Sequence, residues 1–250
     1  MENNAHYTFK DWHIQHLGDH AIVFLLPSII DENIIAQIMR LNFFIESKKI
    51  NGIKDLIPSY HSLTIVYDIS IAQHSILPSF VCKDMIEFGN KLLLDFFNEP
   101  IVEKENKIKN EIIKVPVCYD IEFGIDLKSL AELKNINLEE IIKIHTGTIY
   151  NVYCLGFMPG FAYMGKVDPL IQMNRHSKPR PLVYAGSVGI AGEQTGIYPM
   201  NAPGGWQIIG RTPIRIFDPI NLAKFKMGDR VQFYSIDKAT YLATTQYPTN

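Results

Sequence analysis

Residues 179–210 of this chain read PRPLVYAGSVGIAGEQTGIYPMNAPGGWQIIG, and residues 156–165 upstream of them read GFMPGFAYMG. The span 156–210 holds 10 of the 16 glycines, and Glu193 is the one charged residue between positions 181 and 210. Glycine at this density lets the backbone turn where a Cβ would clash and lets it approach a ligand closely. A surface loop would carry more charge, and a core strand would hold fewer glycines and prolines. The stretch therefore predicts short β segments around a shaped binding site.

The segments on either side of this stretch predict two domains. From residue 150 onward, short β segments alternate with Gly and Pro, which is typical of a β-barrel or sandwich. Near the N-terminus, an apolar run at 20–26 predicts a strand, and apolar periodicity predicts helices after Asp31 and over 84–97. The charged segment 99–114 separates the halves. We predict a ferredoxin-like α+β domain over residues 1–105 and a β-barrel domain over 106–250.

A short helical pair is expected where the second domain begins. Asp126 and Asn137 are the expected N-caps, and Glu140 stands three residues after Asn137 as in a capping box. The second of these helices is expected to end at Gly147, since glycine commonly terminates helices.

Composition excludes several classes of protein. The net charge is −2, with 47% hydrophobic and 20% charged residues, which is ordinary for a globular protein and gives no basic face for nucleic acid. No apolar run is long enough to cross a membrane, and the first residues lack the pattern of a secretory signal. The three cysteines form no CxxC pair. We expect a cytoplasmic protein that binds neither nucleic acid nor membrane and has no metal site of its own.

Four polar residues are the candidates for catalysis. Arg180 stands between two prolines and Arg211 directly follows the glycine-rich tract; arginine offers a bidentate fork for carboxylate or phosphate. His145 lies in the last turn of its predicted helix, where it is either a cation stabilised by the helix dipole or a general base or ligand donor facing the barrel. Gln194 supplies hydrogen-bonding groups without charge.

A small polar ligand is expected to contact residues in and beside the glycine-rich loops. The candidate binding residues are Phe157, Pro159, Gly160, Gly186, Ser187, Gly192, Thr195, Tyr198, Gly204 and Trp206. The aromatic members are either pocket walls or barrel core, and Trp206 is expected to stack on a ligand or on a partner surface. Residues 160–166 match a P-loop by coincidence, because Val167 replaces the hydroxyl that would bind Mg²⁺.

Longer motifs carry a family resemblance. Residues 115–126 (VPVCYDIEFGID), 141–146 (IIKIHT), 153–165 (YCLGFMPGFAYMG) and 179–218 resemble the family of the 5-oxoprolinase B subunit, also described as KipI and as allophanate hydrolase subunit 1. The N-terminal half matches more loosely through LGDHAIVF and IPSYHSLTIVYD, so the resemblance covers nearly the whole chain. Asp120 and Ile121 stand where the family usually has Gly-Gly, so that turn must be built differently.

The resemblance implies a small α+β domain followed by a cyclophilin-like barrel, in a protein that works with a C subunit and an A subunit. Together they would open the lactam 5-oxo-L-proline to L-glutamate, using ATP and Mg²⁺. Arg180 or Arg211 would stabilise the transferring phosphoryl group, the glycine-rich loops would hold the substrate carboxylate, and His145 or Gln194 would orient the attacking group. The alternatives are a KipI-like inhibitor of a sensor histidine kinase and a urea- or allophanate-processing module.

Overall fold

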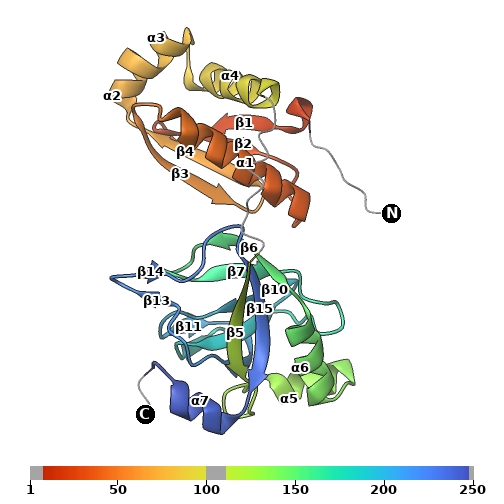
Figure 1. Ribbon diagram of the computed structural model, residues 1–250. Coiled ribbons are helices and arrows are strands. Elements are labelled where there is room, and N and C mark those ends of the chain that lie inside the picture. The colour runs from red at the N-terminus through yellow and green to blue at the C-terminus, as the bar shows by residue number, and fades with distance from the viewer. Residues whose placement is uncertain (1–7, 100–110, 248–250) are drawn as a thin grey trace. The chain divides into compact units, whose positions relative to one another are not determined.

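The computed structural model describes residues 8–99 and 111–247. The chain divides into two compact units, Met1–Ile108 and Lys109–Asn250, which are described separately (Figure 1). The expected domain boundary between residues 105 and 106 lies outside the described residues. Within the described ranges, no helix combines the length and the apolar character needed to cross a membrane.

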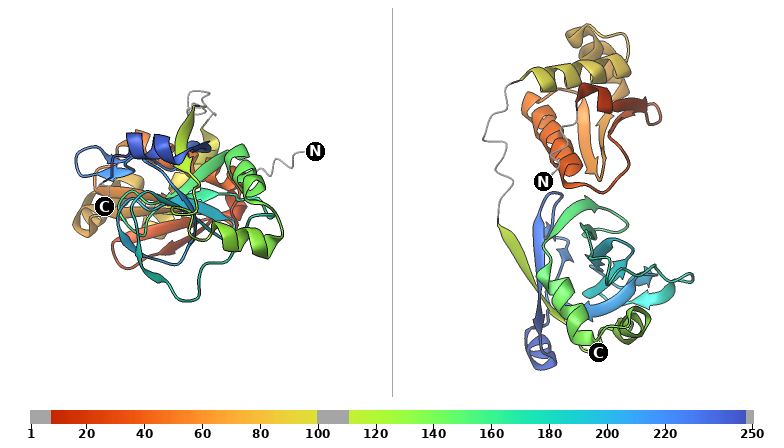
Figure 2. Two further views of the ribbon diagram at one scale, coloured as in Figure 1. Left: turned by 90° about the horizontal axis from the view of Figure 1, so that it is seen from below. Right: turned by 90° about the vertical axis from the view of Figure 1, so that its right-hand side faces the viewer.

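The first unit is a four-stranded antiparallel sheet with two long helices packed on it. Its elements are η1 (Phe9–Asp11), β1 (His13–His16), β2 (Ala21–Leu25), α1 (Glu32–Lys48), β3 (Ile53–Ser59), β4 (Ser62–Tyr67), α2 (Ile69–Ile71), η2 (Ala72–Ile76), α3 (Leu77–Phe80) and α4 (Met85–Asn98). The strand order is β1-β2-β4-β3. Helix α1 contacts β3 and β4, helix α4 contacts β1 and β2, and the helices touch each other, so both cover one face (Figure 2).

Helix α1 forms where the sequence pattern predicts it. Asp31 is its N-cap, and Oδ1 accepts hydrogen bonds from the backbone N–H groups of Asn33 at 2.8 Å and Ile34 at 3.3 Å. These bonds satisfy two of the donors that the first turn leaves open. The apolar side chains spaced at three and four residues are buried, among them Ile38 and Leu41 at 0% exposure. Capping and amphipathic spacing together therefore account for this helix.

The ferredoxin-like arrangement of this unit is not confirmed. A ferredoxin-like domain has the order βαββαβ, whereas the described elements follow the order ββαββα. The edge position beside β2 is held by β1, which comes before it in the chain and joins it through a tight turn at Gly18, with φ of +69°. Strand β1 was missed in the sequence because Ile14 is its one apolar residue.

The second unit is built on a closed barrel with the order β10-β7-β6-β15-β5-β12-β9. Its strands are β5 (Ile112–Cys118), β6 (Tyr150–Leu155), β7 (Ala162–Gly165), β9 (Ser187–Ala191), β10 (Gln194–Ile197), β12 (Gln207–Arg211) and β15 (Arg230–Ile236). Strands β15 and β5 pair in parallel, and the other pairs are antiparallel. Two further two-stranded sheets join β8 (Arg180–Val183) to β11 (Ala202–Gly204), and β13 (Phe217–Asp218) to β14 (Leu222–Ala223). The expected β-barrel is thus confirmed, while its cyclophilin-like character stays a prediction.

The barrel is filled by its own side chains and flanked by short helices. Val117, Ile190 and Phe233 are among the aliphatic and aromatic residues of its core, each at 1% exposure or less. Helices α5 (Leu127–Lys134), α6 (Leu138–Gly147) and α7 (Lys238–Thr244) contact β12, β15 and β5 respectively (Figure 1). The side chain of Asn137 accepts from Glu140 N at 2.7 Å, so the predicted cap of α6 is confirmed, as is its end at Gly147. Asp126 makes no side-chain cap on α5, because its carboxylate is bound elsewhere.

Candidate functional site

A chain of buried polar groups runs through the barrel interior around His145. Tyr119 Oη lies 2.7 Å from His145 Nδ1, and Thr195 Oγ1 lies 3.1 Å from His145 Nε2. The hydroxyl of Thr195 donates its one proton to the carbonyl of Gly189 at 3.0 Å. It must therefore accept a proton from Nε2–H, which leaves Nδ1 to accept from the Tyr119 hydroxyl. The imidazole is held as the neutral Nε2–H tautomer.

This environment keeps His145 uncharged and away from solvent. The side chain has 0% exposure, and its ring stacks on Phe233 with centroids 4.7 Å apart. Burial lowers the pKa of His145 to about 3. The helix-end cation that the sequence allowed is therefore not formed, because a buried charge without a counter-charge is costly. Both ring nitrogens are engaged within the protein, so the geometry supports a structural role for His145 rather than contact with a substrate.

Arg180, at the start of β8, is bound to a buried carboxylate. Its Nη2 lies 2.5 Å from Asp126 Oδ1, and its Nη1 donates to the carbonyl of Trp206 at 3.4 Å. Asp126 is 5% exposed, and its Oδ2 accepts from Ile208 N at 2.6 Å. Charge-assisted bonds of this kind are strong, so they tie three separate segments of the unit together. The charge of Arg180 is compensated inside the protein. Sequence reasoning missed Asp126 as its partner because the two lie 54 positions apart.

Arg211, at the end of β12, lines a pocket of about 410 Å³. Its Nε donates to the carbonyl of Ala185 at 2.8 Å. The guanidinium carbon lies 5.4 Å from the ring centroid of Tyr184 and 5.8 Å from that of Tyr247, within the range of cation–π contact. In the described part of the chain no acceptor bonds its two terminal nitrogens, so Arg211 has donors available for a ligand. The pocket walls also come from the loops after β5 and β10, from α7 and from the segment that follows α7.

The turn after β5 shapes one edge of this pocket. Asp120, which replaces the first glycine usual in the resembling family, accepts at Oδ1 from Glu122 N at 2.9 Å. Its carbonyl accepts from Phe123 N at 2.9 Å and Gly124 N at 2.7 Å. The Asp120 side chain thus stabilises a turn of a different build, as the sequence required. The turn places Glu122 and Phe123 on the pocket wall.

Two of the predicted glycines serve contacts within the protein. Gly160 and Gly186 have φ of +83° and +84°. A Cβ at Gly160 would lie 2.6 Å from Phe217 Cβ, and one at Gly186 would lie 2.6 Å from the carbonyl oxygen of Thr212 and 2.7 Å from Tyr247 Cε2. Gly186 therefore lets Tyr247 lie against the loop beside Arg211.

The remaining two predicted glycines differ from each other. Gly204 packs against the ring of Tyr198, whereas a Cβ at Gly192 would meet nothing within 4 Å.

The P-loop-like run at residues 160–166 and the possible metal ligands were the sequence features relevant to nucleotide and metal binding. Strand β7 occupies residues 162–165 of the run, so its backbone pairs with β6 and β10 and forms no phosphate cradle. In the described ranges, no three or more His, Cys, Asp or Glu side chains gather as a metal-binding group.

The predicted aromatic residues gather around Phe161. The Trp206 ring lies 5.3 Å from the Phe161 ring and 5.8 Å from that of Tyr163, centroid to centroid. Phe157 and Tyr198 lie 5.6 and 5.4 Å from Phe161, and Phe157 is 64% exposed while Tyr198 is buried. Trp206 thus packs against Tyr163 on β7 and Phe161 just before it, which local sequence could not reveal. Its stacking on a ligand or partner stays a prediction.

The last predicted residues lie on separate parts of the barrel unit. Pro159 lies in the turn between β6 and β7, which is closed by Gly156 N donating to Phe161 O at 3.1 Å. Ser187 is buried at the start of β9, and Gln194 starts β10, where it pairs with Ala191. The predicted site residues therefore do not gather in one site. It brings Arg211 to a pocket with Tyr184, Asn201 and Tyr247, which sequence reasoning missed because no local motif marks them.

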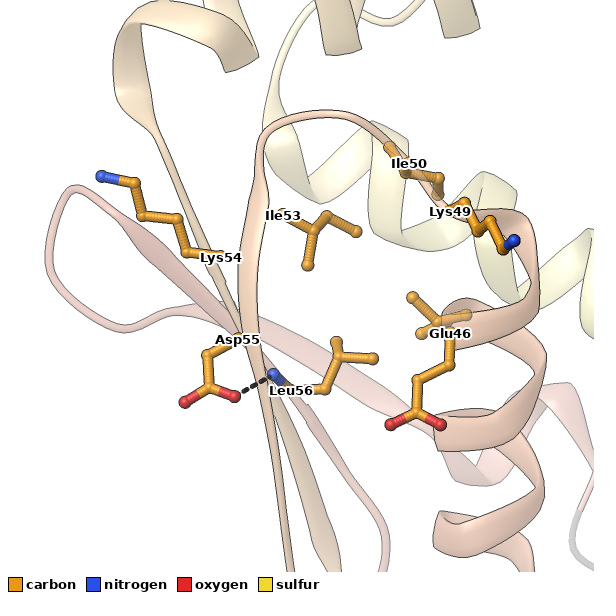
Figure 3. Close-up of a pocket in the computed structure, with 8 residues that line it drawn as sticks. Glu46, Lys49, Ile50, Ile53, Lys54, Asp55 and Leu56 are labelled. Atoms are coloured by element: carbon orange, nitrogen blue, oxygen red, sulfur yellow. Dashed lines mark hydrogen bonds between the residues drawn. The ribbon is translucent and has the colours of Figure 1, made fainter.

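A second pocket, of about 280 Å³, lies between α1 and β3 in the first unit (Figure 3). Ile53 and Leu56 point from β3 toward α1, whereas Lys54 and Asp55 point away, because a bulge shifts the strand register here. Lys54 pairs with Asp68 at 3.0 Å. This pocket contains none of the residues that the sequence predicts for a site.

Comparison with known proteins identifies the family. The family model described as carboxyltransferase domain, subdomain C and D, matches residues 12–226. The 5-oxoprolinase B subunit of Bacillus subtilis (strain 168) is 36% identical over 237 residues, which cover 93% of this chain and 96% of that protein. The 5-oxoprolinase B subunit of Haemophilus influenzae (strain ATCC 51907 / DSM 11121 / KW20 / Rd) is 40% identical over 153 residues, covering 56% and 71%. The crystal structure of TTHA0988 matches with a TM-score of 0.71 and 28% identity over 87% of this chain, which spans 40% of that chain. The present chain belongs to the family of the 5-oxoprolinase B subunit.

Proposed function

We propose that this chain is a component of an ATP-dependent 5-oxoprolinase and takes part, with an A subunit and a C subunit, in opening 5-oxo-L-proline to L-glutamate. The observation that carries the proposal is the nearly end-to-end match to a protein named as the B subunit of 5-oxoprolinase, at 36% identity over 96% of that protein. A match of this extent covers both structural units, so the proposal concerns the whole chain and not the barrel alone.

The chemistry of the lactam explains why such a reaction uses ATP. The amide carbonyl of a five-membered lactam is a weak electrophile, and transfer of a phosphoryl group from ATP to its oxygen supplies a leaving group. The P-loop-like run is a strand paired with β6 and β10, so its backbone gives no phosphate cradle. We therefore assign no nucleotide-binding role to this run and route no ATP step through this chain.

The surroundings of the candidate polar residues indicate which of them can bind a ligand. His145 is enclosed in the barrel and Arg180 is bound to Asp126, whereas Arg211 lines a pocket with its terminal nitrogens available. Arg211 thus takes the binding role, and His145 and Arg180 hold the barrel in shape. Gln194 stays a candidate for orienting the attacking group.

Reconstitution tests the proposal. This chain is mixed with the candidate A and C subunits, and glutamate formed from 5-oxo-L-proline and ATP is measured with all three and with each one left out. We expect glutamate when all three are present and none when this chain is omitted. Equal turnover without this chain would contradict the proposal. Folded and associated subunits that produce no glutamate would favour the regulatory alternative, which a binding assay with a sensor histidine kinase would then test.

A further inference from the structure

The guanidinium of Arg211 is held at one edge and lies beside two aromatic rings. Its Nε is fixed by the carbonyl of Ala185 at 2.8 Å, and the rings of Tyr184 and Tyr247 lie within 6 Å of the guanidinium carbon. Aromatic rings stabilise the cation and shield it from water. The two terminal nitrogens, which present the fork that matches a carboxylate, have no acceptor among the residues that the structure describes. The group is thus preorganised for an anion before any ligand arrives.

The surrounding charges do not oppose an anion. Glu122 is the acidic residue on the pocket wall, and its carboxylate lies 2.6 Å from the ammonium of Lys238, which lines the same wall. The opposite charges of this pair cancel, so the positive charge of Arg211 determines the net charge of the pocket wall. Burial raises the pKa of Tyr247 to about 12, so its phenol is neutral at physiological pH. No side chain of the described pocket wall therefore leaves an unpaired negative charge facing Arg211.

A neutral donor completes the polar lining. Asn201 accepts at Oδ1 from the backbone N–H of Ala185 at 2.8 Å, which orients its amide, and the two Nδ2 protons bond no acceptor among the described residues. Phe123, Tyr241 and Leu242 supply apolar and aromatic wall. A volume of about 410 Å³ lies within the range of small-molecule sites, roughly 300–1,000 Å³. The pocket therefore combines a cation, a neutral donor and apolar surface.

We propose that this pocket binds a small cyclic carboxylate, with Arg211 gripping the carboxylate through its terminal nitrogens and Asn201 Nδ2 donating to a ring carbonyl. Under the proposed function, on which the choice of compound rests, the ligand is 5-oxo-L-proline. The site itself stands on the geometry of Arg211, Asn201 and Tyr184. It makes Arg211 a residue that determines specificity for the carboxylate.

Direct binding tests the site without any partner. The full chain is titrated with 5-oxo-L-proline and with 2-pyrrolidinone, the same lactam without its carboxylate, by calorimetry and ligand-observed NMR. We expect 5-oxo-L-proline to bind and 2-pyrrolidinone to bind at least about 10-fold more weakly, since a charged hydrogen-bond pair contributes roughly that much or more. Arg211→Gln is expected to weaken 5-oxo-L-proline by about 10- to 100-fold. Arg175→Gln, which removes an exposed arginine that does not line the pocket, is the matched control.

Kinetics of the assembled complex separates this inference from the proposed function. Arg211→Gln is expected to raise KM for 5-oxo-L-proline by about 10-fold or more while kcat changes less than about threefold, and Arg211→Lys is expected to recover part of the loss. Turnover with an unchanged KM in Arg211→Gln would overturn the site and leave the function intact. Arg211-dependent binding of 5-oxo-L-proline by a chain whose complex produces no glutamate would leave the site and overturn the function.

A second variant guards against loss of folding. Tyr184 is 44% exposed, so Tyr184→Ala removes one of the two rings beside the guanidinium with little effect on the core. We expect it to weaken 5-oxo-L-proline by about 3- to 10-fold with an unchanged unfolding midpoint. Wild-type affinity in both Tyr184→Ala and Arg211→Gln, or equal affinity of the chain for 5-oxo-L-proline and 2-pyrrolidinone, would refute the inference.

Discussion

Replacing Asp126 by Ala should destabilise the barrel unit by about 4 kcal/mol. Breaking a buried ion pair costs roughly 3–5 kcal/mol because the remaining charge is left unpaired. The Arg180 side chain is 26% exposed, so water recovers part of this and the lower end, about 3 kcal/mol, applies. The Ile208 N–H, in a residue that is 2% exposed, also loses its acceptor, which adds about 1 kcal/mol.

Urea unfolding of the full chain provides the assay. The chain has two tryptophans, Trp12 in the first unit and Trp206 in the barrel unit, so a Trp12→Phe background lets Trp206 fluorescence report the barrel. We expect Asp126→Ala to lower the urea midpoint with an unchanged slope.

The control carboxylate is Glu132, which is exposed on α5, and Glu132→Ala should stay within about 0.5 kcal/mol of wild type. A loss of less than about 1 kcal/mol of unfolding free energy in Asp126→Ala would refute the stabilising role of the Asp126–Arg180 ion pair. Zero coupling energy in a double-mutant cycle with Arg180→Ala would refute it too.

Three further changes are predicted. The folded pKa of His145, about 3, lies below its unfolded value near 6.5. Its contribution to the free energy of unfolding is therefore full above pH 6.5 and falls by about 1.4 kcal/mol per pH unit as the pH drops toward 3. In urea unfolding between pH 7 and 5, His145→Gln should reduce the dependence of the free energy of unfolding on pH, and an unchanged pH dependence would contradict this prediction. Gly186→Ala should destabilise by about 1–3 kcal/mol through strain at positive φ and displace Tyr247, while Gly147→Ala, where a Cβ meets nothing within 4 Å, should be neutral or stabilising in thermal unfolding. Asn137→Ala should cost about 1 kcal/mol by removing the cap of α6, and Asn137→Ser should restore most of it.

Local sequence was sufficient where a structural rule acts within a few residues. Apolar spacing and an Asp cap predicted α1, and Asn137 predicted the start of α6. The glycine-rich tract with its short β segments predicted the barrel, and its long motifs predicted the family. Strand β1 was missed, and the order of the first unit with it, because a strand with one apolar residue is stabilised by pairing with β2 rather than by its own pattern.

The site depended on contacts between distant residues. The sequence by itself determined helices α1 and α6, the barrel and the family, because helix caps, hydrophobic periods and turn residues act over a few positions. Only the tertiary structure decided that His145 is a neutral core residue and that Arg180 is neutralised by Asp126. It also brought Arg211 within 6 Å of the ring centroids of Tyr184 and Tyr247, which lie 27 and 36 positions away in the sequence. Whether an arginine forms an internal ion pair or binds a ligand depends on which carboxylate or aromatic ring the fold places beside it. That neighbour lies tens of residues away in the sequence, so only the folded chain brings the two together.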